Sequence, residues 1–193
     1  MNFLLGELEA FGTDPHAAAV AALGRRRSGF AVLGYLAGAI GTYTWVALGR
    51  DALSPARIIS VVGLLFFAEL AAGYFCSSIS HMFMELSGEN GRARAMFGAL
   101  GMSEFIKLLF IPLALLVQAV SPFIGNIGPL LTLCVVFLQF MAAAALIRIA
   151  YATTASRAWW AVVLPFFLVL IGFFAMVGIL CVLAVTSIMR LFA

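Results

Sequence analysis

The chain has 193 residues, of which 65% are hydrophobic and only 10% are charged, and its mean hydropathy is +1.16. Soluble domains carry about 25% charged residues, so this composition excludes an ordinary soluble protein and predicts an integral membrane protein. The longest polar segments are residues 1–28 and 85–102, which are too short to form a folded soluble domain.

The first 28 residues are predicted to form an amphipathic arm that lies on the membrane surface. Residues 14–24 begin with an N-cap residue, Asp14, followed by Pro15 at the first helical position, and they end at Gly24, a typical helix stop. A helix of this length cannot cross a bilayer, so we expect it to lie in the interface.

Five apolar segments follow, and each supplies the roughly 20 residues that a helix needs to cross about 30 Å of hydrocarbon. They are residues 29–49, 58–84, 103–121, 128–147 and 158–189. Their apolar runs are continuous, without the alternation of a barrel strand, and lipid offers no partner to an unpaired backbone. The sequence therefore predicts an all-α polytopic membrane protein with five transmembrane helices and an interfacial N-terminal arm.

The first two spans carry small or polar residues on one face. Gly34, Gly38 and Gly41 form a stripe in the first span that allows another helix to approach closely. The second span has an acid, Glu69, near its middle, and the residues within about 40° of it on the same helix face are small or polar: Gly73, Cys76 and Ser80. This face is expected to look into the bundle, because a charged group in lipid is costly.

Two interpretations of the face around Glu69 stay open. Glu69 can act as an interhelical hydrogen-bonding group, or it can belong to an ion or substrate site. Convergence of polar residues from other spans on Glu69 around a cavity would favour the second interpretation. Gln118, Thr132 and Gln139 are the residues expected to show this.

The polar stretch SGENGRARAMFG, residues 87–98, interrupts the apolar pattern. Its glycines predict a turn, followed by an interfacial helix. Arg92 and Arg94 are expected to point toward lipid head groups or toward Glu85 and Glu89, and they form a candidate contact surface for anionic lipid or a cytosolic partner.

The last three spans contain further irregularities. Pro112 is expected to kink the third span, while Glu104 and Lys107 are expected to snorkel toward the cytoplasmic head groups. The small residues 142–145 predict close packing of the fourth span. The fifth span is longer than a perpendicular helix requires, so it is expected to tilt or to extend beyond the bilayer.

Basic residues indicate the orientation. Eight of the 11 Lys and Arg residues fall on the side of the N-terminal arm and of the second and fourth connections. The positive-inside rule therefore predicts a cytoplasmic N-terminus and an outer C-terminus. The arm contributes three of these residues, which act as a topology signal or as a contact for lipid or a partner: Arg25, Arg26 and Arg27.

The sequence contains no nucleophile motif and no phosphate-binding glycine loop, so neither an enzyme nor a cofactor is expected. His81 and Glu85 are spaced as i and i+4, which can place two metal ligands on one helix face. Two ligands fall short of a complete first shell, so these residues are weak metal candidates and no metal site is predicted.

The order of segments resembles the bacterial branch of the Ypt-interacting-protein (YIP) family. The resemblance rests on Pro15 in a helix before the first span, on the glycine-containing basic stretch 91–112, and on a Ser-Arg-Ala connection leading to Leu-Pro: Ser156, Arg157, Ala158, Leu164 and Pro165. It implies five spans with a cytoplasmic N-terminus. Eukaryotic members of the family associate with prenylated Rab-type GTPases through a longer N-terminal region than the 28 residues present here.

The ten arginines against one lysine indicate a bacterial genome rich in G and C, and hence an inner-membrane location. The sequence favours a non-enzymatic membrane-organising or partner-binding scaffold of the YIP family. A small transporter or channel subunit that uses the Glu69 face is the alternative. The expected partners are membrane lipids, with other membrane or cytosolic proteins and a homo-oligomer left open, and no nucleic acid is expected.

Overall fold

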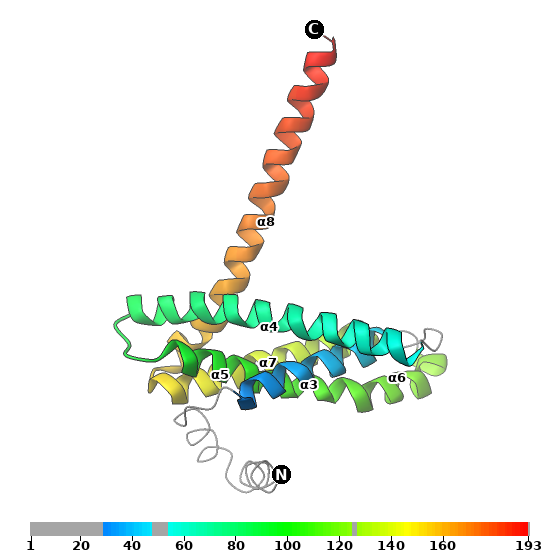
Figure 1. The fold of residues 1–193 in the computed structure, drawn as a ribbon, viewed down its shortest axis with the longest axis vertical. Coiled ribbons are helices and arrows are strands. Elements are labelled where there is room, and N and C mark those ends of the chain that lie inside the picture. The colour runs from blue at the N-terminus through cyan, green and yellow to red at the C-terminus, as the bar shows by residue number, and fades with distance from the viewer. Residues whose placement is uncertain (1–28, 48–53, 125–126, 193) are drawn as a thin grey trace, which may run out of the picture.

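The computed structural model describes residues 29–47, 54–124 and 127–192 of the chain (Figure 1). Its helices are α3 (Gly29–Val46), α4 (Pro55–Leu86), α5 (Ala93–Ser103), the 3₁₀ helix η1 (Glu104–Leu109), α6 (Phe110–Ile124), α7 (Gly128–Tyr151) and α8 (Ala155–Phe192). These residues contain no strand, which confirms the all-α prediction. The N-terminal arm, with the helix expected at 14–24 and the three arginines 25–27, lies outside the described residues.

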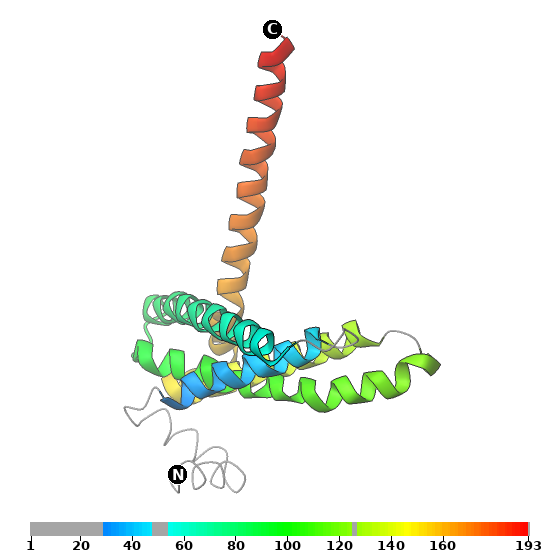
Figure 2. The same cartoon turned by 45° about the vertical axis from the view of Figure 1, so that its right-hand side comes forward.

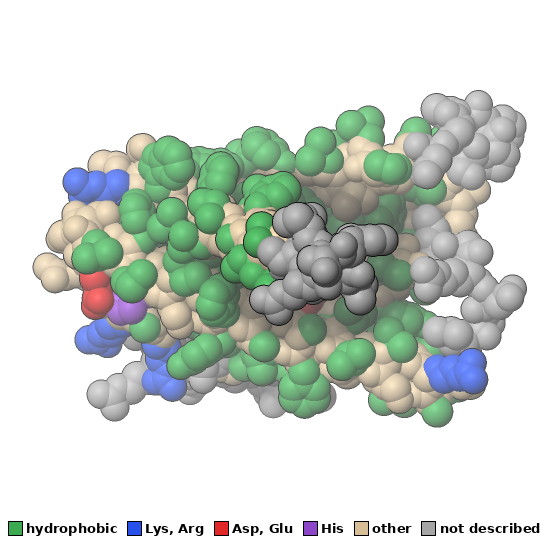
Figure 3. Space-filling model, turned by 90° about the horizontal axis from the view of Figure 1, so that it is seen from above, with side chains coloured by type: hydrophobic (Ala, Val, Ile, Leu, Met, Phe, Trp, Pro, Cys, Tyr) green, Lys and Arg blue, Asp and Glu red, His purple; other side chains and the backbone are tan. Residues whose placement is uncertain are grey.

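Four helical rods form one elongated bundle, made of α3, α4, α7 and the continuous series α5–η1–α6 (Figure 1). The fifth rod, α8, leaves the bundle at a steep angle, as both ribbon views show (Figure 2). Within the described ranges, five helical segments are long and apolar enough to cross a membrane. On the face seen along α8, hydrophobic side chains dominate, and the charged side chains lie mostly at one end of the bundle, with a single basic side chain at the other end (Figure 3).

The third span begins at Ala93, ahead of the expected start at 103, and extends to Val120. A turn at Gly88, whose φ of 81° favours glycine, begins the connection between α4 and α5. Met96 and Ala99 of α5 are fully buried. The interfacial helix expected over this stretch is therefore part of the bundle, because its apolar face packs against the other helices.

The series α5–η1–α6 also departs from α-helical geometry ahead of Pro112. Residues Glu104–Leu109 form a 3₁₀ helix between two α-helices. Pro112 has no N–H to donate to Leu108, four residues earlier, so the α-helical hydrogen-bond ladder is interrupted in this region. The irregularity expected from Pro112 thus takes the form of a 3₁₀ segment.

The glycines of α3 allow close contacts with the third span. A Cβ atom at Gly34 would overlap the backbone oxygen of Gly101 in α5, and one at Gly41 would overlap the backbone of Lys107 in η1. At these glycines the backbone of α3 therefore packs directly against the third span, which is the close approach expected from the glycine stripe.

The proline of α8 is tied to α4 by a side-chain hydrogen bond. Pro165 lies inside α8 and leaves the carbonyl of Ala161 without its usual helical donor. The Ser80 hydroxyl donates to that carbonyl oxygen at 2.6 Å, and it also lies 2.8 Å from the carbonyl oxygen of Cys76 in its own helix. Ser80 and Pro165 are both fully buried, so Ser80 satisfies an acceptor that water does not reach.

We expect Ser80→Ala to lower the free energy of unfolding by about 1–3 kcal/mol, because it leaves the buried Ala161 carbonyl without a donor. Thermal unfolding in detergent measures the change. Ser60→Ala is the matched control, since Ser60 is exposed and bonds only to Ala56 of its own helix, and it should stay within about 0.5 kcal/mol of the parent. Equal losses in the two variants would contradict the role of Ser80.

Candidate functional site

Three charged side chains meet inside the bundle. Lys107 Nζ lies 3.0 Å from Glu69 Oε1 and 2.6 Å from Glu104 Oε2. The exposed fractions of these side chains are 18% for Lys107, 14% for Glu69 and 13% for Glu104. Glu104 and Lys107 are three residues apart in η1, and a 3₁₀ helix aligns side chains at this spacing. The second and third spans are therefore joined by a largely buried ion cluster.

The helix α3 contributes a hydrogen-bond donor to this cluster, and its glycine at position 38 leaves space beside the carboxylates. The Thr42 hydroxyl donates to Glu69 Oε1 at 3.1 Å. A Cβ atom at Gly38 would lie 2.6 Å from Glu69 Oε2 and 2.7 Å from Glu104 Oε2. The absence of a side chain at Gly38 therefore creates the space in which the two carboxylates face α3.

Three buried side-chain atoms of the described residues have no hydrogen-bond partner, and one of them, Glu104 Oε2, has an ion-pair partner in Lys107. Gln139 of α7 donates to Glu104 Oε1 at 2.7 Å, and Lys107 contacts the other Glu104 oxygen as an ion pair without hydrogen-bond geometry. Glu69 Oε2 and the Tyr35 hydroxyl have no partner, although Tyr35 is only 1% exposed. Buried polar groups are normally satisfied, so these two atoms mark a place where a ligand or water can bind.

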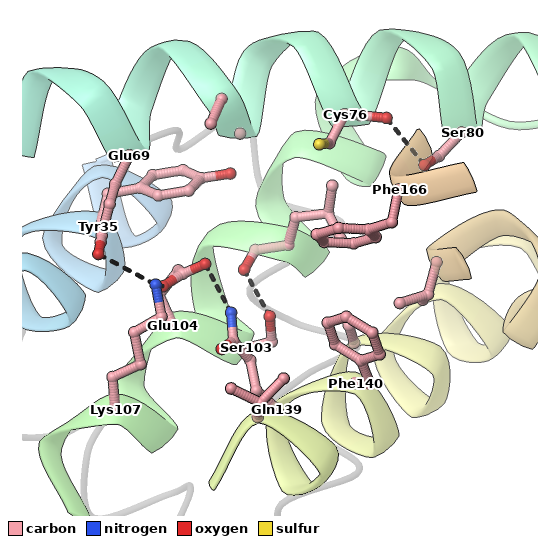
Figure 4. Close-up of a pocket in the computed structure, with 16 residues that line it drawn as sticks. Tyr35, Glu69, Cys76, Ser80, Ser103, Glu104, Lys107, Gln139, Phe140 and Phe166 are labelled. Atoms are coloured by element: carbon pink, nitrogen blue, oxygen red, sulfur yellow. Dashed lines mark hydrogen bonds and ion pairs between the residues drawn. The ribbon is translucent and has the colours of Figure 1, made fainter. Parts of the chain in front are cut away.

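The cluster lines a cavity of about 430 Å³ between the helices. All four residues of the predicted polar face, Glu69, Gly73, Cys76 and Ser80, line it. The charged residues lie at one end, and the aromatic rings of α7 and α8 lie at the other (Figure 4). The remaining apolar lining comes from several helices: Ala72, Leu100, Val136, Phe140, Ala143, Val162 and Phe166.

The charges of the cavity do not cancel. Glu69 and Glu104 are its two carboxylates and Lys107 is its single ammonium group among the lining residues. When all three groups are ionised, the cluster carries one excess negative charge. An uncompensated charge in a buried, low-dielectric place is costly, so a bound cation or proton stabilises this arrangement.

The snorkelling predicted for Glu104 and Lys107 is wrong. Their helical series starts at Ala93, so both residues lie well inside the span, and their side chains turn toward Glu69 in the second span. Of the three polar residues expected to converge on Glu69, Gln139 lines the cavity. Gln118 is exposed, and Thr132 donates to Gly128 of its own helix at 3.0 Å.

His81 and Glu85 lie at one end of the bundle, away from the cavity. His81 Nε2 is 3.3 Å from Glu85 Oε1, and His81 Nδ1 is 2.7 Å from the Tyr151 hydroxyl. The described residues contain no group of three His, Cys, Asp or Glu side chains that could hold a metal ion. The His81 ring is instead held between a tyrosine and a carboxylate.

The connection between α4 and α5 is fixed by Glu89 rather than by its own arginines. Glu89 Oε1 accepts hydrogen bonds from the Thr153 hydroxyl at 2.8 Å and from the Arg157 guanidinium. Arg92 and Arg94 are exposed. Contact of these two arginines with lipid head groups or with a partner stays a prediction.

The hydrogen bonds from Thr153 and Arg157 lower the pKa of the Glu89 carboxyl, and the bond from Thr153 has the larger effect. A carboxylate with a lowered pKa stabilises the fold above its ordinary range of about 4.3, and this contribution is lost as the pH falls through the lowered value. We therefore expect Glu89→Gln to have a lower melting temperature than the parent at pH 7. The difference should shrink as the pH falls from 7 to 3, and a constant difference at both pH values would contradict the assignment.

The fold and the cavity define a multi-pass α-helical membrane protein that holds an ion cluster inside its bundle. Comparison of the chain with known protein families, curated proteins and solved structures finds no match. The residues of the cavity are therefore the basis for a proposed function.

Proposed function

We propose that this protein binds a small cation in the cavity at Glu69, Glu104 and Lys107 and moves it across the membrane. The observation that carries the proposal is the excess negative charge beside a buried carboxylate oxygen that has no partner. Ionisable residues inside spans typically mark ion or substrate pathways. The convergence of Gln139 and Thr42 on the two carboxylates supports this function over a purely structural Glu69.

We expect Glu69→Gln to abolish cation movement while preserving the fold, because glutamine keeps the shape and most hydrogen bonds but cannot ionise. Purified protein in liposomes on a solid-supported membrane reports currents after jumps of protons, Na⁺, K⁺ or an organic ammonium ion. Glu85→Gln is the matched control, since Glu85 lies on the same helix with a side chain 60% exposed. Unchanged currents in a folded Glu69→Gln protein would overturn the proposal.

A second function, a membrane-organising scaffold, is supported by the exposed pair Arg92 and Arg94 and by the resemblance to the YIP family. Basic residues near the membrane attract anionic lipid, by about 1 kcal/mol for each residue. This function predicts that Glu69→Gln is indistinguishable from the parent in every assay. The liposome measurement therefore separates the two functions.

The proposed orientation places the N-terminus and the connections 87–92 and 152–154 in the cytoplasm of a bacterial cell, with the C-terminus outside the inner membrane. It is supported by the eight to three distribution of basic residues. In this orientation Arg92 and Arg94 face cytosolic partners and the anionic lipid surface.

A further inference from the structure

We infer that the cation is an amphipathic primary ammonium ion, with its charged head at Glu69 and an apolar tail against the paired rings of Phe140 and Phe166. This inference rests on the proposed cation-binding function and names the class of its cargo. Three independent features of the cavity carry it: its charge, its unused hydrogen-bonding atoms and the distribution of its apolar walls.

The charge of the site favours a single positive charge. Lys107 is shared between Glu69 and Glu104 and balances only one of them. One further monovalent cation brings the cluster to neutrality, whereas an anion would add to the excess negative charge and a divalent cation would reverse it. A neutral buried cluster avoids the desolvation cost of an unpaired charge.

The unused hydrogen-bonding atoms fit an ammonium group better than a metal ion. A primary ammonium has three N–H donors and no acceptor. Glu69 Oε2 and the Tyr35 hydroxyl are buried acceptors without a partner. The hydroxyl lies against Gly73, one helical turn along α4 from Glu69. Glu69 and Tyr35 both line the cavity, so each offers an acceptor to a bound ammonium ion, while the described residues contain no group of three His, Cys, Asp or Glu side chains that could hold a metal ion.

The walls opposite the cluster fit an apolar tail. Phe140 and Phe166 have ring centroids 4.9 Å apart, and they close the end of the cavity away from Lys107 (Figure 4). Five other lining residues are aliphatic: Ala72, Leu100, Val136, Ala143 and Val162. A volume of about 430 Å³ lies within the range of small-molecule pockets and far exceeds the space needed by a bare monovalent ion. Because the charged residues and the aromatic rings lie at opposite ends of the cavity, the cavity favours a ligand that has both a charged head and an apolar tail.

Three probes separate head from tail: 4-phenylbutylamine has both, 4-phenyl-1-butanol has only the tail, and methylamine has only the head. Titration calorimetry of the protein in nanodiscs, with empty nanodiscs subtracted, measures their affinities. We expect 4-phenylbutylamine to bind at least about tenfold more tightly than either other probe, a difference of about 1.4 kcal/mol. Glu69→Gln should weaken its binding by a similar factor, and Glu85→Gln should leave it unchanged.

Phe166→Ala provides a test that does not depend on the folding of a cluster variant. It shortens the aromatic wall, so it should weaken 4-phenylbutylamine several-fold and leave methylamine unaffected. Tyr35→Phe removes the unpartnered hydroxyl and should weaken both amines. Equal binding of the amine and the alcohol, or equal binding to the parent and Phe166→Ala, would overturn the inference.

Different results would refute the cation function and the amphipathic cargo. Currents of protons, Na⁺ or K⁺ that depend on Glu69, without binding of 4-phenylbutylamine, would refute the amphipathic cargo and keep the cation function. The absence of any cation current that depends on Glu69 would refute both. Binding and current of 4-phenylbutylamine that both depend on Glu69 would support both.

Discussion

Lys107→Met should lower the free energy of unfolding by about 3–5 kcal/mol, since it leaves two buried carboxylates without the ammonium group that both contact. Methionine keeps the length and the apolar stem of the side chain, so the effect reports the charge rather than a cavity. Thermal unfolding of the purified protein in detergent at pH 7 measures the loss.

A matched variant and a rescue separate this effect from general sensitivity to charge removal. Arg157→Met breaks the ion pair with Glu89, but the Arg157 side chain is half-exposed, so it should cost no more than about 1 kcal/mol. Combining Lys107→Met with Glu69→Gln and Glu104→Gln removes the uncompensated charges and should recover most of the stability. A triple variant as unstable as Lys107→Met would show that the cluster charges are not the cause.

Gly34→Ala is expected to produce the second large effect, a destabilisation of about 1–3 kcal/mol or more from overpacking. The added Cβ would overlap the backbone oxygen of Gly101, and a backbone atom cannot rotate away as a side chain can. The two helices would have to separate, which weakens the packing of α3 against α5. Thermal unfolding, together with the fraction of monodisperse protein in detergent, measures the change.

The control for this substitution is Gly63→Ala. Nothing lies within 4 Å of the position that a Cβ at Gly63 would take. Alanine is favoured over glycine inside a helix by about 0.5–1 kcal/mol, so this variant should be neutral or slightly more stable. Similar destabilisation by both alanines would contradict the account of Gly34 as a packing contact.

The sequence was sufficient to predict the features that depend on composition and local spacing. Apolar length and continuity predict the all-α membrane fold, which the helices confirm. Helical geometry alone places Gly73, Cys76 and Ser80 beside Glu69, and all of them line the cavity. The cost of a charge in lipid predicts that Glu69 faces inward, where it contacts Lys107.

The ion cluster was harder to predict, because it depends on where the third span starts. Residues 87–98 are polar and rich in glycine, so the sequence does not indicate that a span starts at Ala93. A span that starts at 103 places Lys107 near the membrane surface, whereas the observed start places it inside the span. Tyr35 and Thr42 were also missed. Their spacing from Gly38, three residues before and four after, puts them on the glycine face of α3, and this signal could have identified them.

The direction of α8 has a mechanical consequence for the cavity. The charged ends of the bundle define a long axis, and α8 runs across it (Figure 1, Figure 3). If that axis follows the membrane normal, α8 becomes a parallel fifth rod only by swinging about its first turns, where Ala161 is fully buried. From Phe166 to Leu183 every residue is exposed, and the ring of Phe166 itself packs against Phe140 of α7, so a swing of α8 would move this aromatic contact.

The pivot of that swing coincides with one wall of the cavity. Val162 lies on the anchored side of Pro165 and Phe166 on the free side, and both line the same space. The remainder of α8 extends about 40 Å beyond Phe166 at 1.5 Å for each residue. The helix is thus a long lever arm that pivots at the aromatic end of the cavity, and a large displacement of its far end corresponds to a small opening at Phe166.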